Sequence, residues 1–145
     1  MKFLLAQINP VVGDLEGNAK KILCTASKAS SNSADLVLTP ELSLWGYPAN
    51  DLLLKKNLIK YQYQILDQLA LDIYKKHGNL SITVGIAEII NDSFFPNLYN
   101  SVALLEHGEW KIIARKIILP TYEVFDEKRY FRSEEKVSVL TKEIN

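Results

Sequence analysis

The stretch Lys116-Ile-Ile-Leu-Pro-Thr-Tyr-Glu-Val-Phe-Asp-Glu-Lys-Arg-Tyr-Phe131 joins an apolar, strand-like run to a short segment crowded with aromatic and charged side chains. Lys116 closes the apolar run and Pro120 follows it closely. A core strand does not need so many Tyr, Phe, Asp, Glu and Arg residues after a proline. Loops that follow scaffold strands often carry binding and catalytic residues. The stretch therefore predicts a strand that ends in a functional loop.

A second candidate segment begins at Pro40, directly after the apolar run 35–39. Glu41 follows this proline, and Leu42-Ser-Leu-Trp-Gly-Tyr-Pro48 surrounds the acid with apolar and aromatic side chains. A lone loop glutamate is usually a solvated acid. Apolar surroundings, however, raise the pKa of a carboxyl group and suit it to general-base catalysis. Because open α/β folds place their sites at the carboxyl ends of strands, Glu41 is a candidate catalytic base.

The hydrophobic pattern along the chain predicts an α/β fold. The expected strands are 3–8, 35–39, 81–87, 99–105 and 110–114, and the expected helices are 19–29, capped by Asn18, and 54–77. This order predicts a mixed sheet flanked by helices on one face. Since the strands are almost continuously apolar, both faces of the sheet should be buried. The chain is therefore expected to need further structure over the second face.

Composition excludes several classes of protein. The 145 residues suffice for one domain, and 17 basic residues balance 17 acidic ones, so we expect neither nucleic acid nor a membrane as partner. The apolar start is broken by Gln7 and Asn9, which does not fit a signal peptide, so the expected location is cytoplasmic. A single cysteine excludes an internal disulfide and a multi-cysteine metal site. No metal site is predicted.

Two motifs together carry a resemblance to a known family. They are P-E-x-x-x-x-G-Y-P from Pro40 and K-x-x-L-P-x-Y from Lys116, and the string V-F-D-E-x-R-Y-F follows the second one. The chain resembles the nitrilase (carbon–nitrogen hydrolase) superfamily, and within it the glutaminase domains of glutamine-dependent NAD synthetases. The resemblance spans essentially all 145 residues. It implies the first half of a four-layer α-β-β-α sandwich, with residues 1–145 a single partial domain that ends before the nucleophilic cysteine.

The resemblance also implies roles for individual residues. Glu41 would be the proton acceptor, and Lys116 would complete a Glu-Lys-Cys triad. Independently of the family, hydrolysis of an amide through a thioester needs positive charge where the oxyanion develops, and a lysine at a rigid strand end provides it. Tyr122, Phe125 and Tyr47 would line the glutamine pocket, although plain packing remains an alternative for Phe125 and Tyr47.

Other polar residues in the sequence carry weaker predictions. Glu127 is either an additional carboxylate near the lysine or only a partner of Arg129, and we favour a structural role. Cys24 lies mid-helix without a motif around it and is expected to be a buried structural thiol. His77 and His107 fall at a helix end and a hairpin turn, so neither indicates a metal ligand or a catalytic base.

The function implied by the resemblance is hydrolysis of L-glutamine to supply ammonia for ATP-dependent formation of NAD from deamido-NAD. The glutaminase half would need no cofactor, and ATP and Mg would bind only in a synthetase domain. The expected partners are that synthetase domain or a complementary half of the same fold, with the full-length form a homo-oligomer. Residues 1–145 alone are expected to be inactive. The alternatives are a non-catalytic docking module and a truncated stand-alone nitrilase-type amidase.

Overall fold

The computed structural model of the protein describes residues 1–91, 94–123 and 125–139. The strands are β1 (Phe3–Leu5), β2 (Leu36–Leu38), β3 (Ser81–Ile89), β4 (Leu98–Glu106) and β5 (Glu109–Arg115). The helices are α1 (Leu15–Ser31) and α2 (Lys56–His77), with 3-10 turns η1 (Asn50–Leu54) and η2 (Glu127–Arg129). The predicted mixed α/β fold is confirmed.

The five strands form one sheet in the order β1-β2-β3-β4-β5. β1, β2 and β3 run parallel, whereas β4 and β5 are antiparallel to their neighbours. The predicted hairpin between β4 and β5 turns at His107 and Gly108, which both have positive φ angles, as a tight hairpin requires. Because β5 follows two reversals from β3, the carboxyl ends of β2, β3 and β5 lie at the same edge of the sheet.

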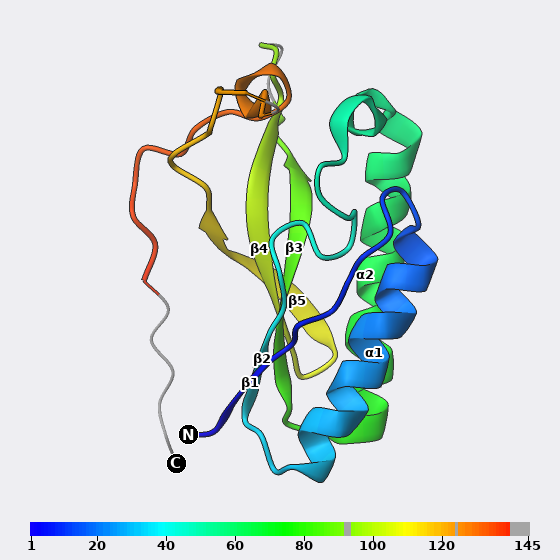
Figure 1. The fold of residues 1–145 in the computed structure, drawn as a ribbon. Helices are drawn as coiled ribbons and strands as arrows, with labels where there is room; N and C mark the ends of the chain where they lie inside the picture. The colour runs from blue at the N-terminus through cyan, green and yellow to red at the C-terminus, as the bar shows by residue number, and fades with distance from the viewer. Residues whose placement is uncertain (92–93, 124, 140–145) are drawn as a thin grey trace.

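Both helices pack on one face of the sheet (Figure 1). α1 begins earlier than predicted, because the Asp14 side chain accepts the Gly17 N–H and caps the helix at Leu15. The prediction of Asn18 as the cap is therefore wrong. Asn18 is fully buried inside the helix, and its amide binds the backbone of Val11 and Leu44. This contact ties the helix to the segment that follows β2.

The buried stripe of α2 differs from the one that the sequence periodicity predicts, which consists of Leu54, Leu58, Tyr61, Ile65, Leu69 and Ile73. Ile73 and Leu69 are buried as expected, but Leu54 precedes the helix and Tyr61 is exposed. The buried positions of the helix are Ile59, Gln62, Leu66, Leu69, Ala70 and Ile73. Gln62 has no exposed surface, accepts the Trp45 indole N–H and the Ala87 N–H, and donates to the Ala87 carbonyl. A polar side chain can occupy this core position because its hydrogen bonds are satisfied there.

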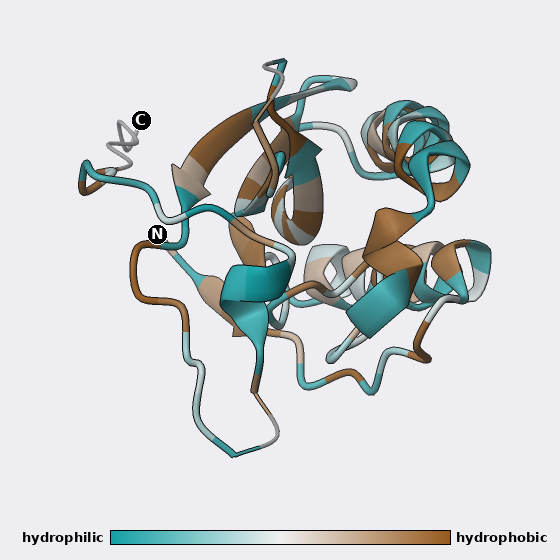
Figure 2. Ribbon diagram, turned by 90° about the horizontal axis from the view of Figure 1, so that it is seen from above, coloured by the Kyte–Doolittle hydropathy of each residue, from teal (hydrophilic) through white to brown (hydrophobic). Residues whose placement is uncertain are grey.

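The second face of the sheet is open along β1 and at the end of β2, whereas β3 is buried from Ser81 to Ala87. Phe3 is 55% exposed and Leu5 is 70% exposed, so the expectation that β1 is buried on both faces is wrong for these residues. In Figure 2 the strands carry mostly hydrophobic residues, whereas the helices show alternating hydrophilic and hydrophobic stripes. Each helix has one buried stripe, as a covering layer requires, whereas β3 is buried at consecutive positions from Ser81 to Ala87 and therefore on both faces.

Within the described ranges, none of the helices combines the length and the apolar character that crossing a bilayer would require.

Candidate functional site

Glu41 is held at the carboxyl end of β2 by a tightly bonded turn. Thr39 Oγ1 contacts Ser43 Oγ at 2.7 Å and donates to the Thr83 carbonyl at 2.8 Å. Ser43 Oγ in turn accepts the Gly85 N–H at 2.9 Å, and Leu44 N–H donates to the Gly85 carbonyl at 3.1 Å. The turn therefore continues the hydrogen bonding to β3 beyond the end of β2. This pairing fixes the backbone on either side of the glutamate.

Gly85 makes that close pairing possible. A Cβ atom at position 85 would lie 2.3 Å from the Leu42 nitrogen and 3.0 Å from the Glu41 carbonyl carbon. Such distances are far below van der Waals contact, so only glycine lets the turn approach β3 this closely. The glycine therefore contributes to the position of Glu41 although it has no side chain.

Lys116 directly follows β5, at the same edge of the sheet. Its N–H donates to the Asn100 carbonyl at 2.8 Å, and its carbonyl accepts the Glu134 N–H at 3.1 Å. The lysine backbone is thus paired on both sides, to β4 and to the segment after residue 131. Because the backbone is paired in this way, the Cα atom of Lys116 is held in place, as a catalytic side chain requires.

The structure brings Glu41 and Lys116 together from positions 75 residues apart in the sequence. Lys116 Nζ lies 2.7 Å from Glu41 Oε1 and 2.9 Å from Glu127 Oε1, so one ammonium bridges two carboxylates. Glu41 Oε1 also accepts Asn100 Nδ2 at 2.6 Å. The Glu41 side chain is 43% exposed, whereas that of Glu127 is only 6% exposed. Of the two carboxylates, Glu41 is therefore the one that a bound molecule can reach.

Apolar side chains do not enclose Glu41 as the sequence led us to expect. Leu42, Leu44 and Trp45 are fully buried, but they turn away into the core while the glutamate remains at the surface of this chain.

Glu127 belongs to this cluster rather than to a surface ion pair. Its Oε1 accepts the Tyr47 hydroxyl at 2.7 Å as well as the lysine ammonium. Arg129 pairs with Asp51 at 3.5 Å, so the expected Glu127–Arg129 partnership is not present. Burial and the hydrogen bond to the Glu127 carboxylate raise the pKa of Tyr47 well above its ordinary value. Tyr47 is therefore a neutral donor at neutral pH.

The three aromatic residues named from the sequence form one contact chain. The Tyr47 and Phe125 ring centroids lie 6.2 Å apart, and Phe125 and Tyr122 meet edge to face at 5.5 Å. Tyr122 is 64% exposed, which leaves its ring available for contact. The Tyr47 hydroxyl connects this chain of rings to the cluster of Lys116 and Glu127.

A cavity of about 550 Å³ opens beside the cluster on the uncovered face of the sheet. Glu41, Asn100 and Lys116 line it together with Gly85 and apolar positions of β2, β4 and β5. A volume of this size accommodates a small organic molecule. The paired charges and the cavity thus occur at one place.

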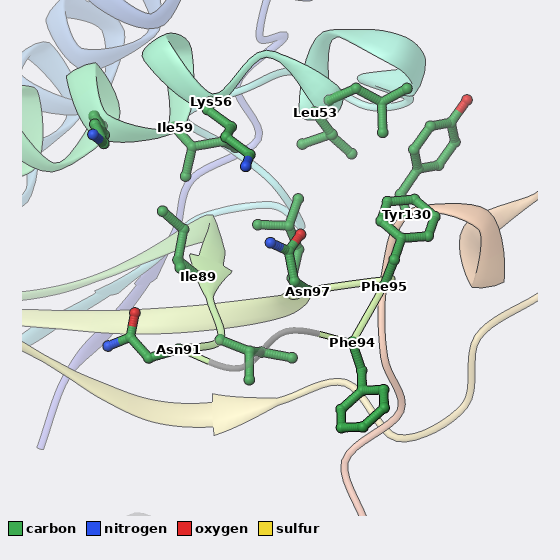
Figure 3. A pocket seen from close by; sticks show the side chains of 13 residues that line it. Leu53, Lys56, Ile59, Ile89, Asn91, Phe94, Phe95, Asn97 and Tyr130 are labelled. Atoms are coloured by element: carbon green, nitrogen blue, oxygen red, sulfur yellow. The ribbon is translucent and has the colours of Figure 1, made fainter.

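A second pocket, of about 480 Å³, lies between α2 and the end of β3 and includes neither Glu41 nor Lys116 in its lining. Figure 3 shows Lys56 and Ile59 on one side of this pocket and Ile89 and Asn91 on the other. Among the described residues that line it, most are apolar and none is a carboxylate. We therefore take the cavity at Glu41 as the candidate functional site.

Cys24 and the two histidines lie outside the cluster. Cys24 is exposed on α1, so the expectation of a buried thiol is wrong. His77 contacts the Ser27 hydroxyl, and His107 lies in the hairpin turn. Among the described residues, no group of three or more His, Cys, Asp or Glu side chains is arranged to hold a metal ion.

Comparison with known proteins identifies the family. Residues 5–144 match the family described as carbon-nitrogen hydrolase. The chain belongs to the carbon–nitrogen hydrolase family. Among curated relatives, this hydrolase chain is 38% identical over 140 residues to the glutamine-dependent NAD(+) synthetase of Thermotoga maritima, and 42% identical over 135 residues to that of Synechocystis sp.. These alignments cover 97% and 91% of the chain, but only 23% and 24% of the two relatives.

Solved structures give the same result for the fold of the hydrolase chain. The glutamine-dependent NAD+ synthetase from Acinetobacter baumannii superposes with a TM-score of 0.83 at 34% identity, over 97% of this chain and 25% of that one. An amidase from Nesterenkonia sp. superposes with a TM-score of 0.70 at 22% identity, over 94% of this chain and 49% of that one. The hydrolase chain therefore spans about a quarter of the length of the synthetases that it matches.

Two members of the cluster, Asn100 and Glu127, were not predicted as site residues. Glu127 lies within the stretch that begins at Lys116, and an acid so close to the lysine in sequence was a usable signal. Asn100 is an amide within the otherwise mostly apolar 98–105 run. A polar residue at a buried strand position requires a partner, and that signal could have marked it.

We predict that Gly85→Ala displaces the turn that carries Glu41 and destabilises the folded chain. The new Cβ would overlap the Leu42 backbone, which cannot move aside like a flexible side chain. We expect a loss of about 1–3 kcal/mol in the free energy of unfolding, measured in urea. Gly78→Ala is the matched control, because no atom lies within 4 Å of its Cβ position and any cost there comes from its positive φ angle alone. An unchanged free energy of unfolding in Gly85→Ala would contradict this account of Gly85.

We predict a pH-dependent contribution of Lys116 to stability. Burial lowers the pKa of Lys116, but the hydrogen bonds to Glu41 and Glu127 outweigh it, so the pKa is raised above its ordinary value of 10.5. The folded state therefore binds this proton more tightly than the unfolded state, and the stabilisation is complete below that ordinary value. It is lost as the pH rises through the folded-state pKa.

The measurement compares the free energy of unfolding of the unsubstituted protein and Lys116→Met from pH 7 upward. The difference should be constant to about pH 10 and then narrow. Lys111→Met removes an exposed ion pair with Glu106 and serves as the control. It should change the free energy by less than about 1 kcal/mol throughout. A difference that widens above pH 10 would mean that the ammonium at position 116 is not stabilised by the two carboxylates.

Proposed function

We propose that this chain supplies the first half of a glutamine-hydrolysing domain, which releases ammonia for ATP-dependent formation of NAD from deamido-NAD. The observation that carries the proposal is the Lys116 ammonium, 2.7 Å from Glu41 and 2.9 Å from Glu127, at the edge of an open cavity. The identity to glutamine-dependent NAD(+) synthetases over nearly the whole chain supports glutamine as the substrate.

In the proposed reaction, Glu41 accepts the proton of a cysteine thiol contributed by the complementary half of the fold. The thiolate attacks the side-chain amide carbon of glutamine, and Lys116 stabilises the negative charge on the tetrahedral oxygen. The C–N bond then breaks, and the nitrogen leaves as ammonia with the proton returned from Glu41. Water, deprotonated by the same carboxylate, hydrolyses the thioester and releases glutamate and the thiol.

The buried Glu127 would position the Lys116 ammonium rather than contact the substrate. With only 6% of its side chain exposed, it has little access to a ligand, and Tyr47 occupies the same oxygen. A second negative charge beside the ammonium keeps Lys116 protonated, as oxyanion stabilisation requires. Tyr122 and Phe125 would contact the amino-acid end of glutamine, since their rings continue from Tyr47 toward solvent.

The open face of the sheet supports a complementary half as the partner of this chain. Phe3, Leu5 and Leu38 are all exposed there, next to the cavity or on the neighbouring strand. Covering them with a second sheet would complete the four-layer arrangement and close the cavity over Glu41. Gel filtration tests this part: a stable, well-behaved monomer of residues 1–145 would argue against a missing half.

Ammonia release from L-glutamine tests the proposed function. We expect release by the full-length protein, meaning residues 1–145 with any chain that the coding sequence adds. Residues 1–145 alone should release no more ammonia than their Glu41→Gln variant, because their one thiol, Cys24, lies on α1 outside the cluster. Faster release by residues 1–145 would refute the need for a second half. A preference of the full-length protein for acetamide over glutamine would favour the stand-alone amidase instead.

A further inference from the structure

Asn100 contacts both members of the central pair. Its backbone carbonyl accepts the Lys116 N–H at 2.8 Å, and its side-chain Nδ2 donates to Glu41 Oε1 at 2.6 Å. The carboxylate oxygen can only accept, so the amide nitrogen must be the atom that faces it. Asn100 is 5% exposed on β4, where it pairs with Ala87 of β3. One buried residue on a central strand thus links the base to the cation.

We propose that Asn100 is a positioning residue, which fixes the Glu41 carboxylate relative to Lys116 and leaves its second oxygen as the proton acceptor. This inference rests on the proposed function and extends it to a residue outside the Glu-Lys-Cys triad. Glu41 Oε1 receives both the amide and the ammonium. In the part of the chain that the structure describes, no side chain or backbone group donates to Glu41 Oε2. The two donors therefore select which oxygen is free.

The chemical nature of the donor fits this role. A carboxylate held only by an ammonium can rotate about its last bond, because a single point charge does not define its plane. A second donor at a different angle restricts that rotation. Because the amide is neutral, it orients the carboxylate without adding a second positive charge, which would oppose acceptance of a proton. Lys116 supplies the charge, and Asn100 supplies the direction.

The contrast with Glu127 supports the assignment. Glu127 Oε1 also receives one neutral donor, Tyr47, and the same ammonium, but its Oε2 is buried and has no hydrogen-bond partner among the described residues. Glu41 has the same two-donor arrangement at an exposed position beside the cavity. The arrangement around Lys116 is therefore nearly symmetric, and only on the Glu41 side does it present an oxygen to a ligand.

Kinetics of the full-length protein with glutamine test the inference. Asn100→Leu keeps the approximate shape and removes the donor. We expect kcat to fall about 10- to 100-fold with little change in KM, since the base is misplaced while the binding surface remains. In the Glu41→Gln background, the same substitution should cause no further loss, because Asn100 acts through Glu41. Tyr63→Phe, which removes the hydroxyl that accepts the Ile89 N–H, is the control and should retain full kcat. If Asn100→Leu is not folded, Asn100→Ser replaces it, because the shorter hydroxyl cannot reach Glu41.

Crystal structures of the unsubstituted full-length protein and its Asn100→Leu variant give a readout independent of activity. We expect the Glu41 carboxylate to move by more than about 0.5 Å or to rotate relative to Lys116 Nζ in the variant. Two outcomes would overturn the inference. One is an unchanged geometry of Glu41 and Lys116 in Asn100→Leu, and the other is an equal loss of kcat on adding Asn100→Leu to the unsubstituted protein and to Glu41→Gln. Absence of glutamine hydrolysis in the unsubstituted protein would refute the proposed function, and the crystal structures would then still decide whether Asn100 positions Glu41.

Discussion

Glu41→Gln is expected to lower the rate of glutamine hydrolysis by the full-length protein by about 10²- to 10⁴-fold, the contribution typical of a general base. The amide keeps the size of the side chain and can still contact Lys116 through its oxygen. It cannot take the proton of a thiol or of water. The substitution thus removes proton transfer while it leaves the turn between β2 and η1 in place.

The assay follows ammonia from L-glutamine at saturating substrate, with a thermal melt to verify folding. Glu109→Gln makes the same chemical change on the exposed β4–β5 hairpin and should retain the activity of the unsubstituted protein. A Glu41→Gln variant with more than about a tenth of the original rate would show that another group accepts the proton.

Lys116→Met is expected to have a comparable effect, a loss of about 10²- to 10³-fold in kcat. The variant removes the positive charge that faces the developing oxyanion and leaves Glu41 and Glu127 without their shared cation. Lys116→Arg should not restore the rate, since a planar guanidinium cannot place one compact charge between two carboxylate oxygens. The measurement is kcat for glutamine, compared with Lys111→Met as the exposed control.

Recovery of most of the activity in Lys116→Arg would mean that charge alone matters at this position. A kcat close to that of the unsubstituted protein in Lys116→Met would mean that other groups stabilise the oxyanion, for example backbone N–H groups of the complementary half.

The sequence predicted the layout of the fold well because the pattern of each element is local. The alternation in β3 and the His107-Gly108 turn are properties of a few neighbouring residues, and both elements formed as expected. The start of α1 was placed too late, since Asn18 and Asp14 both qualify as caps by residue type. Asp14 is the cap, because the buried Asn18 amide instead forms hydrogen bonds with the backbone of Val11 and Leu44.

The site could be predicted only in part. Glu41 and Lys116 were found because each follows a strand within a recognisable motif, and the structure places them 2.7 Å apart. The contact of Asn100 with Glu41 joins segments 59 residues apart, which no local pattern specifies. For Glu127 the sequence left two alternatives, and the structure shows the one in which it lies near the lysine. The solvent exposure of Glu41 was also misjudged, because it depends on which face of the sheet this chain leaves open.

The proposed reaction requires Glu41 and Lys116 to contact the same small amide. A crystal structure of the full-length Glu41→Gln protein with L-glutamine tests this most directly. We predict that the side-chain amide of glutamine lies within about 3 Å of both Lys116 Nζ and residue 41, in the cavity beside Asn100. Glutamine bound at another place, or residues 41 and 116 too far apart for one amide to reach both, would contradict it.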